Sequence, residues 1–301
     1  MADPVFILAP GRTFTSVICG MLGQHPQMYG LPELYLNLAD TMRDWWIKCG
    51  AGRTALHHGL VRAVAQLYCG AQTEETVSEA YQWIRQHFRI GTDGVFRLLA
   101  EQLEPRIAVE KSPYSVTRDE NLARLLRFFP SARFIHLVRH PRATCASLLK
   151  FENAVRLLSR SNIAYDFSTN PPTLDPQVWW HENHLRIKSF TESLPTSQWL
   201  RLQGERFLME PQEHLRRVTA WLGLRCDDAA LARMMHPEGS PFARFGPPSS
   251  PFGNDHDFLQ SPEFRPFRDK GEALDDALEW RSDGCGFLPE VKELARELGY
   301  R

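Results

Sequence analysis

A short run of residues near the start of the chain collects side chains that bind anions. Residues 10–16, Pro-Gly-Arg-Thr-Phe-Thr-Ser, lie between two apolar runs and supply an arginine, three hydroxyl groups and a glycine that permits a tight turn. Arginine presents a forked set of N–H donors suited to phosphate, and a loop that enters a helix offers free backbone N–H groups at the positive end of the helix dipole. The run predicts an anion site, although an ordinary turn with a surface arginine and capping hydroxyls fits the loop equally well when it is taken alone.

A second cation follows another apolar run. The segment 132–141, Ala-Arg-Phe-Ile-His-Leu-Val-Arg-His-Pro, reads as a strand that ends at Arg139. A P-loop kinase tends to place a Mg²⁺-binding aspartate at such a strand end, and residues 10–16 lack the Gly-Lys-Ser/Thr of a Walker A loop. Because ligands of open α/β sheets bind beyond the carboxyl ends of the strands, Arg12 and Arg139 predict two anionic groups on one ligand, with no metal between them.

The elements that position these cations alternate along the chain. Short apolar runs at Val5–Leu8, 106–113, 132–141 and 199–208 read as strands, and helical patterns separate them. This alternation predicts one α/β domain with a short, mostly parallel sheet flanked by helices. We expect the first helix to begin directly after the anion loop, with Thr15 or Ser16 as its N-cap residue.

Two further regions differ from this alternation. Residues 34–104 have a helical pattern rich in aromatic residues, which predicts a helical region packed over the sheet. Residues 237–270 are rich in Pro, Gly, Ser and Phe and show little periodicity, which predicts an irregular loop or lid. No linker divides the chain, so we expect a single domain over residues 1–301.

Composition excludes several classes of protein. The 35 basic and 36 acidic residues give a net charge of −1, which argues against a general surface for nucleic acid or anionic membranes. The six cysteines are scattered without a CxxC pair, which favours a reduced cytoplasmic interior over a disulfide framework or a metal site. We find no pattern of a signal peptide or of a membrane span.

These residues resemble the sulfotransferases that use 3′-phosphoadenosine-5′-phosphosulfate (PAPS), especially the bacterial and tyrosylprotein branches. Residues 10–16 are similar to the 5′-phosphosulfate loop of that family. Arg139 and Ser147, eight residues apart, are similar to its 3′-phosphate motif. The segments 109–114 and 204–224 resemble its Lys-x-Pro strand end and its Glu-containing strand exit. The resemblance implies a P-loop-like α/β sulfotransferase, a transferase that binds PAPS without a metal.

The resemblance also implies a role for each residue of the site. Glu33 lies 21 residues after Arg12, where the tyrosylprotein branch has its catalytic base. Lys111 and Arg12 would stabilise the charge that builds on the departing phosphate. The implied set for binding PAPS is Gly11, Arg12, Thr13, Phe14, Thr15, Ser16, Arg139 and Ser147.

Three positions depart from the family pattern. Phe14 stands where the family usually has glycine, so it must either avoid a positive φ or carry strain. Gly204 stands where a tyrosine often precedes the glutamate, so adenine must stack on another residue. The C-terminal Arg-Lys-Gly element is only hinted at by Arg268 and Lys270.

The predicted reaction moves the sulfuryl group of PAPS to a hydroxyl of a small or carrier-bound organic acceptor. Glu33 would remove the hydroxyl proton, which in general-base catalysis is worth about 10²–10⁴-fold in rate. A plain structural role is the alternative for each residue: Glu33 as a first-turn helix acid, Lys111 as a partner of Glu110 or of another surface acid, and Arg139 as a strand-end cation. His136 is the alternative base.

A small-molecule kinase and a nucleotide-binding protein without turnover are the competing functions. The acceptor and the oligomeric state do not follow from the sequence.

Overall fold

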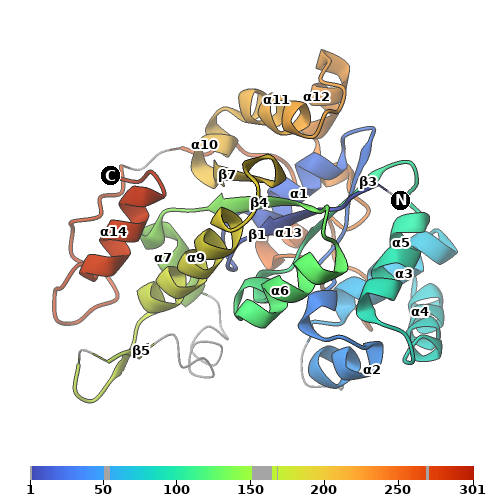
Figure 1. The fold of residues 1–301 in the computed structure, drawn as a ribbon, viewed down its shortest axis with the longest axis horizontal. Helices are drawn as coiled ribbons and strands as arrows, with labels where there is room; N and C mark the ends of the chain where they lie inside the picture. Colours follow the sequence, from blue (N-terminus) through green and yellow to red (C-terminus); the bar gives the residue numbers. More distant parts are fainter. Residues whose placement is uncertain (1, 51–54, 151–164, 168, 269–270) are drawn as a thin grey trace.

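The central sheet has five parallel strands. In this computed structural model, which describes residues 2–50, 55–150, 165–167, 169–268 and 271–301, the strand order is β2-β3-β1-β4-β7 (Figure 1). These strands are β1 (Val5–Leu8), β2 (Met28–Gly30), β3 (Ile107–Lys111), β4 (Arg133–Val138) and β7 (Trp199–Gln203). Every neighbouring pair is parallel. The predicted fold class, a short parallel sheet flanked by helices, is confirmed.

One strand was missed, and the predicted exit of the strand in residues 199–208 is a helix. β2 was not predicted, because its three residues are too few to show a period. The run 199–208 is a strand only as far as Gln203, and helix α10 (Gly204–Met209) takes up the rest. The apolar residues of 204–209 belong to a helix face rather than to a strand, and a short apolar run does not distinguish the two.

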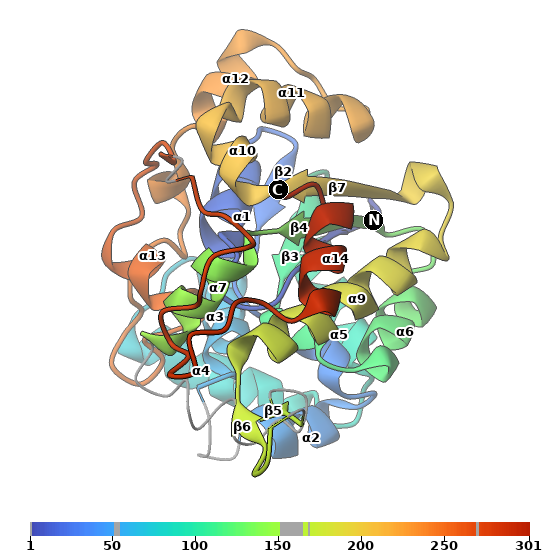
Figure 2. The same ribbon diagram turned by 90° about the vertical axis from the view of Figure 1, so that its left-hand side faces the viewer.

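The two faces of the sheet pack against different helices, because alternate residues of each strand point to opposite faces. Phe6 and Leu8 of β1 belong to a core shared with the helices that follow β2, whereas Val5 and Ile7 belong to a core shared with α1 (Thr15–Gly23). The second core is completed by α10, α11 (Pro211–Trp221) and α12 (Asp228–Met234). Figure 2 shows these last three helices together at one end of the molecule.

The segment between β2 and β3 is helical. It holds two short irregular helices, η1 (Leu36–Leu38) and η2 (Trp46–Gly50), and the helices α2 (Met42–Trp45), α3 (His58–Cys69), α4 (Glu74–Gln86) and α5 (Thr92–Glu101). The longer helices lie side by side at one end of the sheet (Figure 1), and their apolar faces fill the first core.

The remaining helices cover the middle and the other end of the sheet. They are η3 (Pro113–Val116), α6 (Asp119–Phe128), α7 (Pro141–Leu149), α9 (Pro176–Glu192), η5 (Thr196–Gln198) and α14 (Pro289–Glu297). Helices α9 and α14 contact each other around a third, smaller core. No helix in the described part of the chain combines the length and the apolar character needed to cross a bilayer.

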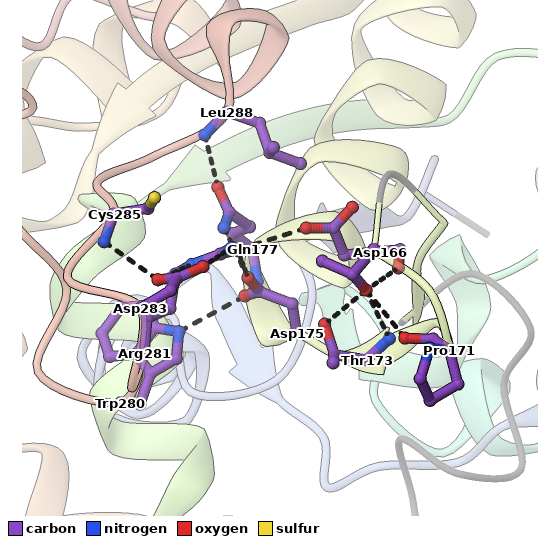
Figure 3. Close-up of polar contacts among 11 residues, drawn as sticks. Asp166, Pro171, Thr173, Asp175, Gln177, Trp280, Arg281, Asp283, Cys285 and Leu288 are labelled. Carbon is purple, nitrogen blue, oxygen red and sulfur yellow. Dashed lines mark hydrogen bonds and ion pairs between the residues drawn. The ribbon is translucent and has the colours of Figure 1, made fainter.

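An arginine fastens the C-terminal segment to the start of α9. Two strands, β5 (Tyr165–Asp166) and β6 (Thr173–Leu174), form an antiparallel pair just before α9. Arg281 donates to Asp166 over 3.2 Å and to Asp175 over 2.7 Å, and both carboxylates are buried. Figure 3 shows that Asp283 lies against the same guanidinium group, from which it accepts a hydrogen bond over 2.6 Å. A desolvated cluster of this kind fixes the route of the chain before α14.

The segment predicted as an irregular loop or lid contains two short helices. These are η6 (Pro237–Gly239) and α13 (His256–Gln260). The rest of residues 237–268 runs without regular structure, and Lys270 lies outside the described residues.

Candidate functional site

The anion loop joins β1 to α1 through two left-handed residues. Arg12 has φ 67° and Phe14, the N-cap residue of α1, has φ 59°. The prediction of Thr15 or Ser16 as N-cap was wrong, because both lie inside the first turn and no side chain caps this helix. A left-handed aromatic residue costs on the order of 1–3 kcal/mol, which the surrounding contacts must offset.

The Phe14 ring is held on three sides. The guanidinium carbon of Arg139 lies 4.2 Å from its centroid, and the ring of Phe267 packs against it edge-on at 5.8 Å. A Cβ atom built on Gly204 would stand 2.7 Å from Cδ2 of Phe14. The two departures from the family pattern, at positions 14 and 204, therefore meet in space: the Phe14 ring fills the room that a side chain at 204 would need.

One cavity of about 660 Å³ opens over this loop. Arg12 donates through Nε to the Ser147 hydroxyl over 3.0 Å, and Arg139 donates to the Arg12 carbonyl over 2.7 Å. The structure thus brings the two predicted anion-binding patches into a single cavity. Of the predicted set, Arg12, Thr13, Phe14, Thr15, Ser16, Arg139 and Ser147 line it.

The opposite wall of the cavity comes from the segment before and after α13. Asp255 and Asp257 both form ion pairs with the Arg12 guanidinium. Burial alone would lower the pKa of Arg12, but the charges and hydrogen bonds of these two carboxylates outweigh it and raise that pKa. Neither aspartate was predicted, because they lie more than 240 residues from the loop and no local pattern connects them to it.

Arg139 is more deeply buried than Arg12. Burial lowers its pKa, against the opposing charges of Glu205 and Glu272. Glu205 also accepts from the backbone N–H of His140 over 2.7 Å and from the Tyr300 hydroxyl over 2.9 Å. These bonds hold the strand end that carries Arg139.

Lys111 and Glu33 lie behind the anion loop. Lys111 is fully buried at the end of β3, donates to the Ser16 hydroxyl over 2.8 Å and forms an ion pair with Glu33. Neither Lys111 nor Glu33 lines the 660 Å³ cavity. Ser16, which does line it, lies between these two residues and the cavity. The alternative of Lys111 as a partner of Glu110 is not what the structure shows, and Glu33 does not start a helix, since η1 begins at Leu36.

The backbone around Glu33 is tied to distant parts of the chain. Its N–H donates to the Gly253 carbonyl over 2.8 Å, so the segment that supplies Asp255 also covers Glu33. The Tyr35 hydroxyl donates to Oε2 of Glu33 over 2.7 Å. Tyr35 was not predicted, because a tyrosine two residues from a glutamate is no recognisable pattern.

A second carboxylate supports the same turn. Glu110 is buried and accepts from the Leu34 N–H over 3.1 Å and from the Ser112 hydroxyl. Burial raises the pKa of Glu110 to about 7. The Ser112 hydroxyl in turn accepts from the Tyr35 N–H over 2.9 Å, so residues 33–35 are fixed from the end of β3.

His136, the alternative base, lies elsewhere. It is fully buried on β4, where its Nε2 atom lies 3.1 Å from Nδ1 of His184, and burial lowers its pKa well below the ordinary value.

Arg268, by contrast, does line the cavity. Gly11 belongs to the loop without being part of the cavity wall. In the described residues, no group of three or more His, Cys, Asp or Glu side chains is arranged to hold a metal ion.

Comparisons with known proteins identify the family and the fold. A family model described as "Sulfotransferase family" matches residues 4–228, about three quarters of the chain. The sulfotransferase domain of the Synechococcus PCC 7002 olefin synthase is 24% identical, with a TM-score of 0.74 over 100% of this chain and 97% of that one. The sulfotransferase domain from the curacin biosynthetic pathway is 20% identical, with a TM-score of 0.79 over 100% and 99%. These two structures share the fold.

Proposed function

The chain belongs to the sulfotransferase family, and from this premise we propose that it transfers the sulfuryl group of PAPS to a hydroxyl group of an organic acceptor. The proposal includes a single domain over residues 1–301 and a cytoplasmic location. The observation that carries it is the common cavity of Arg12 and Arg139. A ligand with phosphate groups at both the 3′ and the 5′ position of one ribose needs such separated cations in one space.

The groups around the cavity fit such a ligand. The Nε atom of Arg139 is buried and has no hydrogen-bond partner among the described residues. A buried N–H donor without an acceptor is costly, and an anion bound beside Arg139 would supply one. The hydroxyls of Thr13, Thr15 and Ser16 and the open N-terminus of α1 add neutral donors to the same wall.

In the proposed reaction, Glu33 accepts the proton of the acceptor hydroxyl. The freed oxygen forms a bond to sulfur while the bond from sulfur to the 5′-phosphate oxygen breaks, and 3′-phosphoadenosine-5′-phosphate leaves with that electron pair. Arg12 and Lys111 stabilise the charge on the leaving oxygen, and preorganised donors of this kind are worth about 10²–10³-fold each. The Lys111–Ser16 bond puts the buried cation next to the anion loop.

The acceptor class in this proposal is an alcohol of a biosynthetic intermediate, free or bound to a carrier. The two similar solved domains come from an olefin synthase and from a biosynthetic pathway, which supports that class. The aromatic residues of the helical segment between β2 and β3 would supply an apolar wall for it.

The first test is binding. We expect 3′-phosphoadenosine-5′-phosphate to raise the melting temperature far more than ATP with Mg²⁺, and Arg139→Ala to weaken that nucleotide much more than AMP. Preference for ATP, or activity lost with EDTA, would favour the small-molecule kinase. Equal losses for the two nucleotides in Arg139→Ala would remove the 3′-phosphate assignment.

The second test is turnover, measured as release of 3′-phosphoadenosine-5′-phosphate from PAPS with water and short alcohols as acceptors. We expect Glu33→Gln to bind nucleotide normally and to lose turnover. Binding without product in the wild-type protein would indicate a nucleotide-binding protein. Retained turnover in Glu33→Gln would assign proton removal to another group, and the exposed His256 of α13 would be tested next.

A further inference from the structure

The carboxylate of Glu33 is held at both oxygens. Lys111 contacts Oε1 and the Tyr35 hydroxyl donates to Oε2 over 2.7 Å. We propose that Tyr35 is a positioning residue that holds the Glu33 carboxylate in place for proton removal. This inference rests on the proposed role of Glu33 as the base.

Tyr35 is built rigidly into the fold. Its side chain is buried, its backbone is left-handed with φ 54°, and its ring packs against Tyr114 with centroids 5.7 Å apart. Non-glycine residues in this conformation are uncommon and persist where the surroundings impose it. The Ser112 hydroxyl imposes it here by accepting from the Tyr35 N–H.

The hydroxyl group acts as a permanent donor. Burial, with the nearby charge of Glu33, raises the pKa of Tyr35 well above its ordinary value, so the phenol keeps its proton. A carboxylate has about four lone-pair sites. With one site on each oxygen occupied by Lys111 and Tyr35, each oxygen keeps a site for a proton from the acceptor hydroxyl.

A donor to a carboxylate stabilises the ionised form over the protonated one. Without the Tyr35 hydroxyl, the Glu33 carboxylate would lose one of its two orienting contacts. We therefore expect Tyr35→Phe to lower turnover by about tenfold without weakening nucleotide binding. The charged or titratable groups facing Glu33 in the described structure are Cys19, Tyr35, Glu110, Lys111 and Tyr114.

The test compares two tyrosine variants of the full-length protein by release of 3′-phosphoadenosine-5′-phosphate from PAPS. Tyr35→Phe should lower kcat about tenfold and leave the Kd for 3′-phosphoadenosine-5′-phosphate unchanged. Tyr114→Phe is the matched control, because it removes the hydroxyl of the ring packed against Tyr35, and it should lower kcat less than about twofold.

A double variant gives the second readout. If Tyr35 acts through Glu33, adding Tyr35→Phe to Glu33→Gln should cost no further turnover, whereas a simple packing defect would add to the loss. Unchanged kcat in folded Tyr35→Phe would overturn the inference, as would equal losses in both tyrosine variants. Turnover retained by Glu33→Gln would instead refute the role of Glu33 as base.

Discussion

The two carboxylates on Arg12 lead to a prediction about affinity for the sulfuryl donor. Arg12 is the loop cation that should receive an anion, yet Asp255 and Asp257 already occupy its two terminal nitrogens. A bound anion must either displace them or share the guanidinium group with them. Replacing Asp255 by asparagine removes one negative charge and keeps the N-cap of α13, because asparagine caps as well as aspartate.

The size of the effect follows from exposure. The side chain of Asp255 is 28% exposed and that of Asp257 is 71% exposed, against 18% for Arg12. Two unit charges about 4 Å apart interact by about 4 kcal/mol at an effective dielectric of 20 and by about 1 kcal/mol in water. Because Asp255 is half-buried, we expect Asp255→Asn to strengthen binding of the anion by about 1–2 kcal/mol, or roughly tenfold. Water screens Asp257 more, so we expect Asp257→Asn to strengthen that binding only about two- to fivefold.

Calorimetry with 3′-phosphoadenosine-5′-phosphate measures this directly. Asp255→Asn should lower its Kd about tenfold near 50 mM salt, and the gain should shrink near 0.5 M salt, where the screening length falls to a few ångströms. Glu263→Gln is the control, because Glu263 lines the same cavity but pairs with Arg244 instead of Arg12. Weaker binding in Asp255→Asn would refute the reasoning, since the aspartates would then be holding Arg12 in its binding position.

Three other substitutions test the surrounding structure by urea unfolding. Arg281→Ala removes the ion pairs of Arg281 with the buried carboxylates of Asp166 and Asp175 and should lower the free energy of unfolding by about 3–5 kcal/mol, whereas Arg296→Ala, which removes an exposed partner of Asp275, should cost under about 1 kcal/mol. Equal losses would contradict this. Burial raises the pKa of Glu110 to about 7, so its contribution to stability is full below about pH 4.5 and is lost as the pH rises through 7. Between pH 4 and pH 8, the free energy of unfolding of Glu110→Gln should therefore increase by about 3 kcal/mol relative to that of the wild type. A difference that stays constant with pH would refute this. Gly253 has φ 123°, and a Cβ atom there would stand 2.8 Å from Gly59. Gly253→Ala should therefore lower the free energy of unfolding more than Gly70→Ala, because Gly70, at φ 79°, has no neighbouring atom within 4 Å of its Cβ position. The reverse order would show that the clash at Gly253 relaxes freely.

Much of the fold was predictable because its signals are local. β1, β3 and β4 are short apolar runs that end in Pro, Gly or charge, and all three were predicted close to their bounds. The anion loop was predictable for the same reason, since its arginine and hydroxyls are adjacent in sequence. Arg139 and Ser147 were predicted from the resemblance to the family's 3′-phosphate motif; both line the cavity, where Ser147 accepts from Arg12.

The rest of the site depends on contacts between distant segments. Asp255 and Asp257 reach Arg12 only because residues 237–268 fold back over the start of α1, and no periodicity foretells that path. Tyr35 contacts Glu33 because its backbone turns into the left-handed region, which local propensity opposes for an aromatic residue. Phe14 adopts the same conformation against the same preference.

Phe14 and Gly204 constrain each other. A Cβ atom built on Gly204 would stand 2.7 Å from the Phe14 ring, so any larger side chain at 204 needs a smaller one at 14. Because the ring also packs against Arg139 and Phe267, a substitution at only one of the two positions should lower stability, whereas a matched exchange at both should be tolerated.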